Sequence, residues 1–261
     1  MRNFTTFLGK EFIESIRTKK LLVLGLVFVS FAITSPLLAR FMGEFFALLM
    51  PADDETAQIF VEAFSNPVWQ ESYIHLYSNL SQIGIFALLF MYMATVSREI
   101  RTGTASLMFS KGLGYGEFVL AKFVMGCIIV VLITIASVLV AYMYTFLLFD
   151  EAGNIGHIIL GSLIFSLGAV TALGYTIMFS SLTKSTGASA GMSFGLYFGL
   201  ALLGGIPVIG PYIPSNLLSG YAISVSFGDF SRYMVINAGI ATAFIALCLL
   251  ISSRALMRAE G

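Results

Sequence analysis

The sequence predicts an all-α integral membrane protein with six transmembrane helices, and three observations support this prediction. The 261 residues are 58% hydrophobic and only 11% charged, whereas soluble domains carry roughly 25% charged residues. Six long stretches lack Asp, Glu, Lys and Arg, and each is close to the roughly 20 apolar residues that a membrane crossing needs. The charged residues lie between these stretches and are sorted by sign.

This sorting predicts how the chain is oriented. If both termini are cytoplasmic, twelve of the fourteen basic residues and five of the fourteen acidic residues face the cytoplasm, which leaves two basic and nine acidic residues outside. Such an excess of Lys and Arg on one side is typical of cytoplasmic loops. We therefore expect a multi-pass membrane protein with a defined orientation. The formal net charge of zero conceals this asymmetry.

The whole chain, residues 1–261, is predicted to form one transmembrane domain. Residues 2–18 place apolar side chains on one half of a helix and charged ones on the other, which favours a helix lying in the cytoplasmic interface. The apolar block that follows lacks the flanks and cleavage site of a signal peptide, so we expect it to remain as the first span. Spans are expected at about residues 21–38, 77–97, 123–149, 155–182, 186–206 and 233–253.

The segment after the fifth span, residues 207–228, is the least regular part of the prediction. Pro207, Pro211 and Pro214 should break the helix. No charged residue lies between 185 and 228 to anchor two further crossings. We therefore expect a re-entrant pair of short helices in the outer leaflet, buried against protein. An ordered outer loop is the alternative.

The fifth span carries a stripe of glycines. Gly187, Gly191, Gly195 and Gly199 recur at every fourth position and so lie on one face of the helix. Such a stripe allows close approach of another helix. The partner helix could belong to the same subunit or to a second copy, and the sequence leaves both open. Gly204 lies beyond the stripe and should tolerate a larger side chain better.

The connection at residues 98–122 contains a series of motifs. Around it stand Glu99, the Gly103-Thr104 pair, a short hydrophobic helix and the later Phe118-x-x-x-Lys122. Lys10-Glu11-Phe12 precedes the first span, and residues 79–84 begin the second. In this order the motifs resemble type-2 ATP-binding-cassette (ABC) permeases of the six-span bacterial exporter type. One departure is the glycine-rich Gly112–Gly116, where the family commonly has a proline and a basic residue, so the docking geometry stays open.

The resemblance implies a permease subunit of the bacterial inner (cell) membrane. Its expected partners are a second permease, identical or homologous, two copies of an ABC ATPase, and membrane lipid. ATP and Mg would bind to the ATPase, because this chain has no phosphate-binding Gly-x-x-x-x-Gly-Lys-Ser/Thr loop. We expect no enzymatic site, cofactor, metal or nucleic-acid partner in this chain. Residues 98–122 would couple it to the ATPase through Glu99, Arg101, Gly103, Thr104, Leu107 and Met108.

Two details of this coupling element are predicted from its residues. Ala105, Leu107 and Met108 should form the apolar face of a short helix that seats in the ATPase, and Glu99 and Arg101 could pair across that joint. The alternative is a solvated connection whose basic residues merely follow the positive-inside rule.

The resemblance also implies a cavity between two permeases, lined mainly by the second and fifth spans. Large apolar side chains and Met suit a hydrophobic or amphipathic substrate such as a peptide, an antibiotic or a lipid. The candidate lining residues are Phe86, Phe90, Met93, Phe194, Tyr197 and Phe198. Each could instead face lipid or the core of the subunit.

Other function classes are less consistent with the sequence. The apolar stretches carry no charged residue, whereas carriers driven by protons or sodium normally keep such residues in their pathway. No hydrolase or zinc motif is present, which disfavours a membrane enzyme. Export is the expected direction of transport. A non-transporting membrane subunit, such as a sensor, immunity protein or assembly scaffold, is the alternative.

Overall fold

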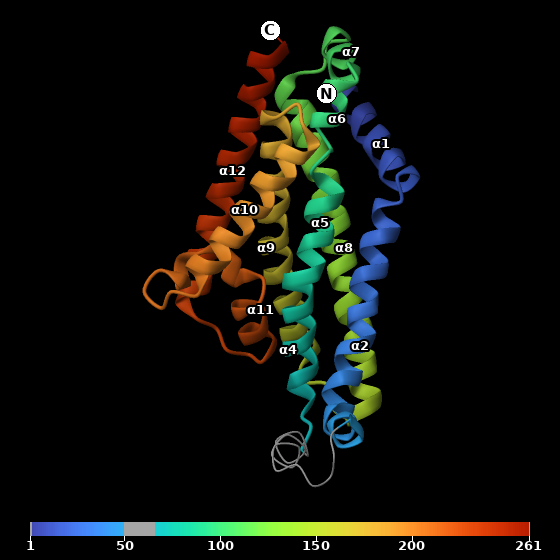
Figure 1. The fold of residues 1–261 in the computed structure, drawn as a ribbon, viewed down its shortest axis with the longest axis vertical. Coiled ribbons are helices and arrows are strands. Elements are labelled where there is room, and N and C mark those ends of the chain that lie inside the picture. Colours follow the sequence, from blue (N-terminus) through green and yellow to red (C-terminus); the bar gives the residue numbers. More distant parts are fainter. Residues whose placement is uncertain (1, 50–65, 261) are drawn as a thin grey trace.

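The computed structural model describes residues 2–49 and 66–260. Within these ranges every regular element is a helix, and six helices are long and apolar enough to cross a membrane (Figure 1). The predicted all-α membrane fold is therefore confirmed. The six candidate spans are Lys20–Phe45, Trp69–Arg101, Tyr115–Phe149, Ile155–Leu182, Thr186–Gly204 and Arg232–Arg258.

The elements follow one another as a series of long helices with short ones between them. In chain order they are α1 (Arg2–Arg17), α2 (Lys20–Leu49), α4 (Trp69–Asn79), η1 (Leu80–Gly84), α5 (Ile85–Tyr92), α6 (Ser97–Arg101), α7 (Thr104–Ser110), α8 (Tyr115–Phe149), α9 (Ile155–Leu182), α10 (Thr186–Gly204), η2 (Gly210–Tyr212), η3 (Pro214–Leu217), α11 (Gly220–Ser226) and α12 (Arg232–Glu260). The π-helical turn η1 joins α4 to α5, so these three elements build one span.

Helix α9 forms the centre of the bundle. It packs against α5, α8, α10, α11 and α12. In its most apolar stretch, 67% of the residues are buried. Helix α2 packs on α8 and α4 at the other side. Aromatic rings join the two parts, since Phe165 of α9 lies 5.7 Å from Tyr77 of α4 and 6.4 Å from Phe28 of α2, measured between ring centroids. Helix α10 lies at the periphery of the bundle, since only 17% of the residues in its most apolar stretch are buried.

The two ends of the bundle hold different parts of the chain. The N-terminal helix α1, the C-terminal end of α12, the short helices α6 and α7, and the turn between α9 and α10 lie at one end (Figure 1). The turn between α8 and α9 lies at the other. We call the first the basic end, because it holds the groups of basic residues that the sequence sorts to one side.

The segment after α10 folds back onto the bundle as η2, η3 and α11, which pack against α9, α10 and α12. Two amide side chains bind the backbone of this segment. Nδ2 of Asn216 donates to the carbonyls of Gly204 and Gly210, and Nδ2 of Asn237 donates to those of Pro211 and Ile213. The segment is thus ordered and contains short helices, while its depth in a membrane stays a prediction.

This return of the chain contradicts the expected tolerance at Gly204. A Cβ atom added to Gly204 would lie 2.6 Å from Oγ of Ser215 in η3, which is closer than real Cβ contacts. The reason is that η3 packs directly against the last turn of α10. A position that looked free in the sequence is therefore one of the tightest.

Candidate functional site

Helix α8 begins much earlier than the predicted third span and brings a lysine into the bundle. It starts at Tyr115 rather than near residue 123, and the Glu117 carboxylate accepts the Gly114 backbone N–H at 3.2 Å, which caps the helix. Phe118 and Lys122 are one helical turn apart and therefore share a face. Lys122 is only 2% exposed. It belongs to the buried start of the third span and not to a solvated loop.

Helix α1 presents a matching face to α8. Phe7 stacks on Phe118 with ring centroids 5.4 Å apart. Glu11 follows Phe7 by one turn, so it also points toward α8, and it is 5% exposed. Helix α1 therefore binds the third span through one aromatic contact and one charged side chain.

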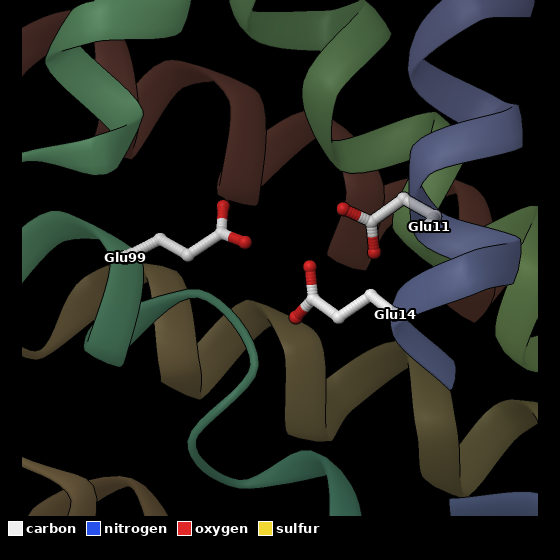
Figure 2. Close-up of side chains that lie close together, drawn as sticks. All are labelled: Glu11, Glu14 and Glu99. Atoms are coloured by element: carbon white, nitrogen blue, oxygen red, sulfur yellow. The ribbon is translucent and has the colours of Figure 1, made fainter. Parts of the chain in front are cut away.

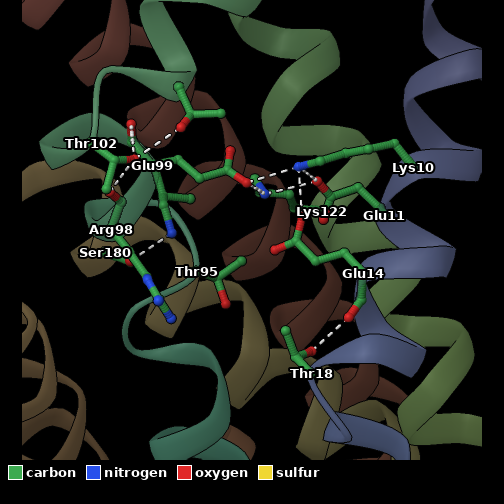
Figure 3. A network of polar contacts seen from close by, with 12 residues as sticks. Lys10, Glu11, Glu14, Thr18, Thr95, Arg98, Glu99, Thr102, Lys122 and Ser180 are labelled. Atoms are coloured by element: carbon green, nitrogen blue, oxygen red, sulfur yellow. Dashed lines mark hydrogen bonds and ion pairs between the residues drawn. The ribbon is translucent and has the colours of Figure 1, made fainter.

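These helices and α6 meet in a ring of alternating charges. Nζ of Lys122 lies 2.9 Å from Oε1 of Glu11 and 3.0 Å from Oε1 of Glu99. Nζ of Lys10 lies 3.1 Å and 2.9 Å from the same two oxygens (Figure 3). We call Lys10, Glu11, Glu99 and Lys122 the ion ring. It joins α1, α6 and α8 through groups far apart in the sequence.

Glu14 extends the ion ring on the exposed side, with Oε2 2.6 Å from Nζ of Lys10. Burial alone would lower the pKa of Lys10, but the hydrogen bond to Glu14 and the charges of Glu11 and Glu99 outweigh burial and raise it. Burial likewise opposes the ionisation of Glu14, but Lys10 and Lys122 lower the pKa of Glu14 below its usual 4.5. Both groups therefore stay charged at neutral pH.

The three carboxylates also form the one group of potential metal ligands found in the described part of the chain. Oxygens of Glu11, Glu14 and Glu99 lie within 4.8 Å of one another and point toward a common centre (Figure 2). The ammonium groups of Lys10 and Lys122 already lie 2.6–3.1 Å from these oxygens. The lysines thus occupy the positions that a cation would take, and the cluster is an internal salt-bridge network.

Hydrogen bonds to a side chain of α9 fix the start of the short helix α6. The backbone N–H groups of Val96 and Ser97 both donate to Oγ of Ser180, each at 3.0 Å. This serine satisfies donors that a helix start leaves unpaired. The turn into α7 is made by Gly103, whose φ of 72° favours glycine. The glycine of the Gly-Thr pair is thus explained by backbone geometry.

The prediction that Ala105, Leu107 and Met108 form one apolar face of α7 is wrong. Ala105 is buried and Met108 packs against the core, whereas Leu107 is 64% exposed. Residues 105 and 108 share a helix face, while residue 107 is about 200° from residue 105. Arg101 is exposed, whereas Glu99 is buried in the ion ring. The geometry therefore does not support Glu99 pairing with Arg101 or with a partner across a joint.

The candidate cavity residues come together between α5 and α10. Phe86 lies 5.4 Å from Phe194, 5.6 Å from Tyr197 and 5.5 Å from Phe198, between ring centroids. Phe90 lies 4.8 Å from Phe194. The sixth candidate, Met93, directly follows α5 and is half-buried.

This aromatic cluster is fixed to the bundle at one point. The Tyr197 hydroxyl donates to the Ser81 carbonyl in η1. A π-helical turn departs from the α-helical hydrogen-bond pattern and is frequent at functional sites, and residues 79–84 belong to the motifs quoted above. The outer rings remain open, since Phe90 is 56% and Phe198 51% exposed.

The glycine stripe lies on the same peripheral helix, and the space beside it is open in the described part of the subunit. A Cβ atom added to Gly191, Gly195 or Gly199 would meet no described atom within 4 Å, and one at Gly187 would meet only Oγ of Ser185 at 3.9 Å. Of the two alternatives, packing within the subunit is thus wrong for the described residues. We call Phe90, Gly191, Gly195 and Phe198 the α5–α10 face.

Comparison with known proteins agrees with this architecture. Residues 5–216 match the family model described as ABC-2 family transporter protein. The chain belongs to the ABC-2 transporter family. It is also similar to the uncharacterized transmembrane protein YxlG of Bacillus subtilis (strain 168), with 23% identity over 190 residues that cover 73% of this chain and 72% of YxlG. This ABC-2 protein is therefore a multi-pass membrane permease by family.

Sequence reasoning missed four residues of the site. Lys10, Glu11 and Lys122 stood in the motifs that carry the family resemblance, but no role was assigned to them. Their signal was that two separate motifs, Lys10-Glu11-Phe12 and Phe118-x-x-x-Lys122, each held charged residues near an apolar span. Ser180 gave no such signal, because a serine in a long apolar helix is not distinguished from its neighbours by sequence.

Proposed function

We propose that this ABC-2 protein is the membrane subunit of an ATP-driven exporter of hydrophobic or amphipathic molecules. The observation that carries the proposal is the α5–α10 face, where half-exposed aromatic rings share a surface with glycines beside which the described residues leave open space. A second permease, identical or homologous, would pack against this face. Two copies of an ABC ATPase would bind ATP and Mg.

The substrate site would lie between the two permeases. Phe90 and Phe198 would line it, with Phe86, Phe194 and Tyr197 behind them and Met93 beside α5. Rings and Met side chains can repack around varied apolar shapes. Peptides, antibiotics and lipids are the substrate classes that this lining suits.

The ion ring gives the coupling step a physical basis. A displacement of α6 and α7 by the ATPase would be transmitted to α1 and α8, because breaking a buried ion pair is costly. Leu107 and Arg101 face outward and would meet the ATPase. Gly103 and Thr104 shape the turn, Met108 anchors α7 to the core, and Glu99 acts as a positioning residue.

Co-purification with the ATPase tests this proposal. Leu107→Asp should abolish recovery of the ATPase while membrane insertion stays normal, because a charge would replace an exposed apolar contact. Met257→Asp is the matched control, since Met257 is 47% exposed at the same end of the bundle on α12. Equal recovery with both variants would contradict α7 as the docking element. Failure of the unmodified protein to bind any ABC ATPase would favour the non-transporting alternative.

The proposal places both termini and the basic end in the cytoplasm, on the inner face of the cell membrane. Single cysteines at Lys111 and Glu151 can test this in a background with Cys127 and Cys248 replaced by serine. Both positions are exposed, at opposite ends of the bundle. An impermeant thiol reagent should label only position 151 in intact cells. Labelling of position 111 without lysis would mean that the chain has the opposite orientation to the one proposed.

A further inference from the structure

An open groove of about 560 Å³ separates α1 from α6 and α7 at the basic end. Ile13 and Arg17 line one wall, and Arg98, Thr102 and Thr104 line the other. A second cavity of about 140 Å³ shares several of the groove's lining residues and is lined also by Lys20 and Thr95. Figure 3 shows Thr95 and Arg98 across from Glu14 and Thr18. Lys10 and Glu99 of the ion ring also line the groove, together with Glu14 and Thr18. Both of these carboxylates are paired with Lys10.

The walls of the groove carry a surplus of positive charge. Lys10 and Lys122 neutralise carboxylates, as described above. In the described part of the chain, Arg17, Lys20 and Arg98 form no ion pair with a carboxylate. Nζ of Lys20 instead contacts Oγ1 of Thr95 at 3.5 Å. Together with the ion ring and Glu14, five cations face three carboxylates, which leaves two positive charges directed at the groove.

The groove also has an apolar rim at the position where the membrane span begins. Ile13 and Ile16 of α1 are 58% and 55% exposed, and α2 continues with Leu22 at 58%. An amphipathic helix with such an exposed apolar face lies at the boundary between headgroups and acyl chains. The groove therefore combines cations that form no ion pair with apolar side chains at its edge, next to the start of the first span.

We propose that this groove binds an anionic phospholipid of the cytoplasmic leaflet. Arg17 and Arg98 would hold the phosphate from opposite walls, Lys20 would add a third charge, and Thr102 and Thr104 would offer hydroxyl groups. The first acyl carbons would lie against Ile13. Basic pockets beside transmembrane helices on the cytoplasmic side are suited to such headgroups. The lipid would brace α1 against α6, which goes beyond the transport role proposed above.

Lipid titration of the purified full chain tests this inference without an ATPase or a transport substrate, so its outcome is independent of the proposed function. Dioctanoyl phosphatidylglycerol is added in detergent and bound lipid is counted by native mass spectrometry. One equivalent should bind, and dioctanoyl phosphatidylcholine should bind much more weakly. Arg17→Gln/Arg98→Gln should weaken phosphatidylglycerol binding about 25-fold, because each basic residue contributes roughly a factor of five.

The matched control removes the same charge elsewhere at the basic end. Arg254 and Arg258 are exposed on α12, away from the groove. Arg254→Gln/Arg258→Gln should change the affinity by less than about twofold, since these residues lie outside the site. Equal weakening in both double variants would overturn the inference. Elution volume and melting temperature confirm that each variant is folded.

A second pair of variants tests the apolar rim and remains informative if the arginine variant fails to fold. Ile13→Gln should weaken phosphatidylglycerol binding, whereas Phe12→Gln should not, because Phe12 does not line the groove. Displacement of the lipid by inorganic phosphate at equal concentration would show a free-anion site and overturn the lipid assignment. Unchanged lipid binding with lost ATPase recovery in Arg17→Gln/Arg98→Gln would identify a protein-docking groove instead.

Discussion

The ion ring and the α5–α10 face differ in how far the chain completes them. In the ion ring, side chains from α1, α6 and α8 pair with one another and three of the four are almost fully buried. On the α5–α10 face, aromatic rings are half exposed, and a Cβ atom added to either glycine would meet no described atom within 4 Å. The charges of the first region are paired within one chain, and Oε2 of Glu99 is its one buried side-chain oxygen without a hydrogen-bond partner among the described residues. The second region is the surface on which we propose that another permease packs, so substitutions there should affect assembly and substrate more than stability.

The largest expected effect comes from removing the buried cation of the ion ring. Lys122→Met leaves the carboxylates of Glu11 and Glu99 without their buried partner, which should cost about 3–5 kcal/mol. The melting temperature of the detergent-purified protein should fall strongly. Lys111→Met is the matched control at an exposed lysine and should change little.

A companion variant separates charge from shape in the ion ring. Lys122→Met combined with Glu11→Gln and Glu99→Gln removes the buried charges together, and should recover much of the lost stability. If Lys122→Met alone were as stable as the unmodified protein, the ion ring would not hold α1, α6 and α8 together.

A smaller effect on stability but a large one on assembly is expected on the glycine stripe. Gly195→Leu should reduce recovery of the permease dimer, measured by light scattering after size exclusion, with little change in the melting temperature of the monomer. Gly239→Leu on α12 is the control, because an added Cβ there also meets no described atom within 4 Å. Gly204→Leu should instead lower the melting temperature, owing to Ser215. Dimer recovery equal to that of Gly239→Leu would show that the stripe faces lipid.

Substitutions in the aromatic part of the α5–α10 face should change substrate binding and leave the fold unchanged. Phe198→Ala should raise the substrate concentration that half-stimulates the ATPase between about twofold and tenfold, as expected for a lost aromatic contact. Phe146→Ala is the control, since Phe146 is 53% exposed on α8, much like Phe198. The same change with both variants would exclude a substrate site at Phe198.

The smallest effect is expected from pH. The pKa of Glu14 is lowered below 4.5, so its stabilising contribution is present above that pH and is lost as the pH falls through the folded value. The pKa of Lys10 is raised above 10.5, so its contribution is complete below that pH and is lost only as the pH rises through the folded value.

Between these limits the melting temperature should stay nearly constant. The measurement is best made from about pH 5.5 to 9 with His75 and His157 replaced by glutamine, so that imidazole titration does not contribute. A steep transition in this range would mean that a member of the network changes protonation near neutral pH and that the ion ring is not permanently charged.

The sequence by itself determined the helical membrane fold, the number of spans and the family. These properties follow from local quantities: the length of each apolar stretch, the sign of the charges between stretches, and the spacing of proline and glycine. The order of the motifs around Lys10, Glu99 and Lys122 identified the family for the same reason. The aromatic residues of the second and fifth spans do lie against one another in the subunit, while their role in lining a cavity between two permeases stays a prediction.

Only the tertiary structure decided what these residues contact. Lys122 became the buried partner of Glu11 and Glu99 because α8 starts early and α1 packs on it. Leu107 faces outward because Ala105 and Met108 turn inward together, and Gly204 is tight because η3 returns to α10. Each outcome depends on which helix faces pack together. Contacts between segments that are far apart in the sequence, in some cases by more than a hundred residues, decide that packing. A local sequence pattern carries no information about such contacts.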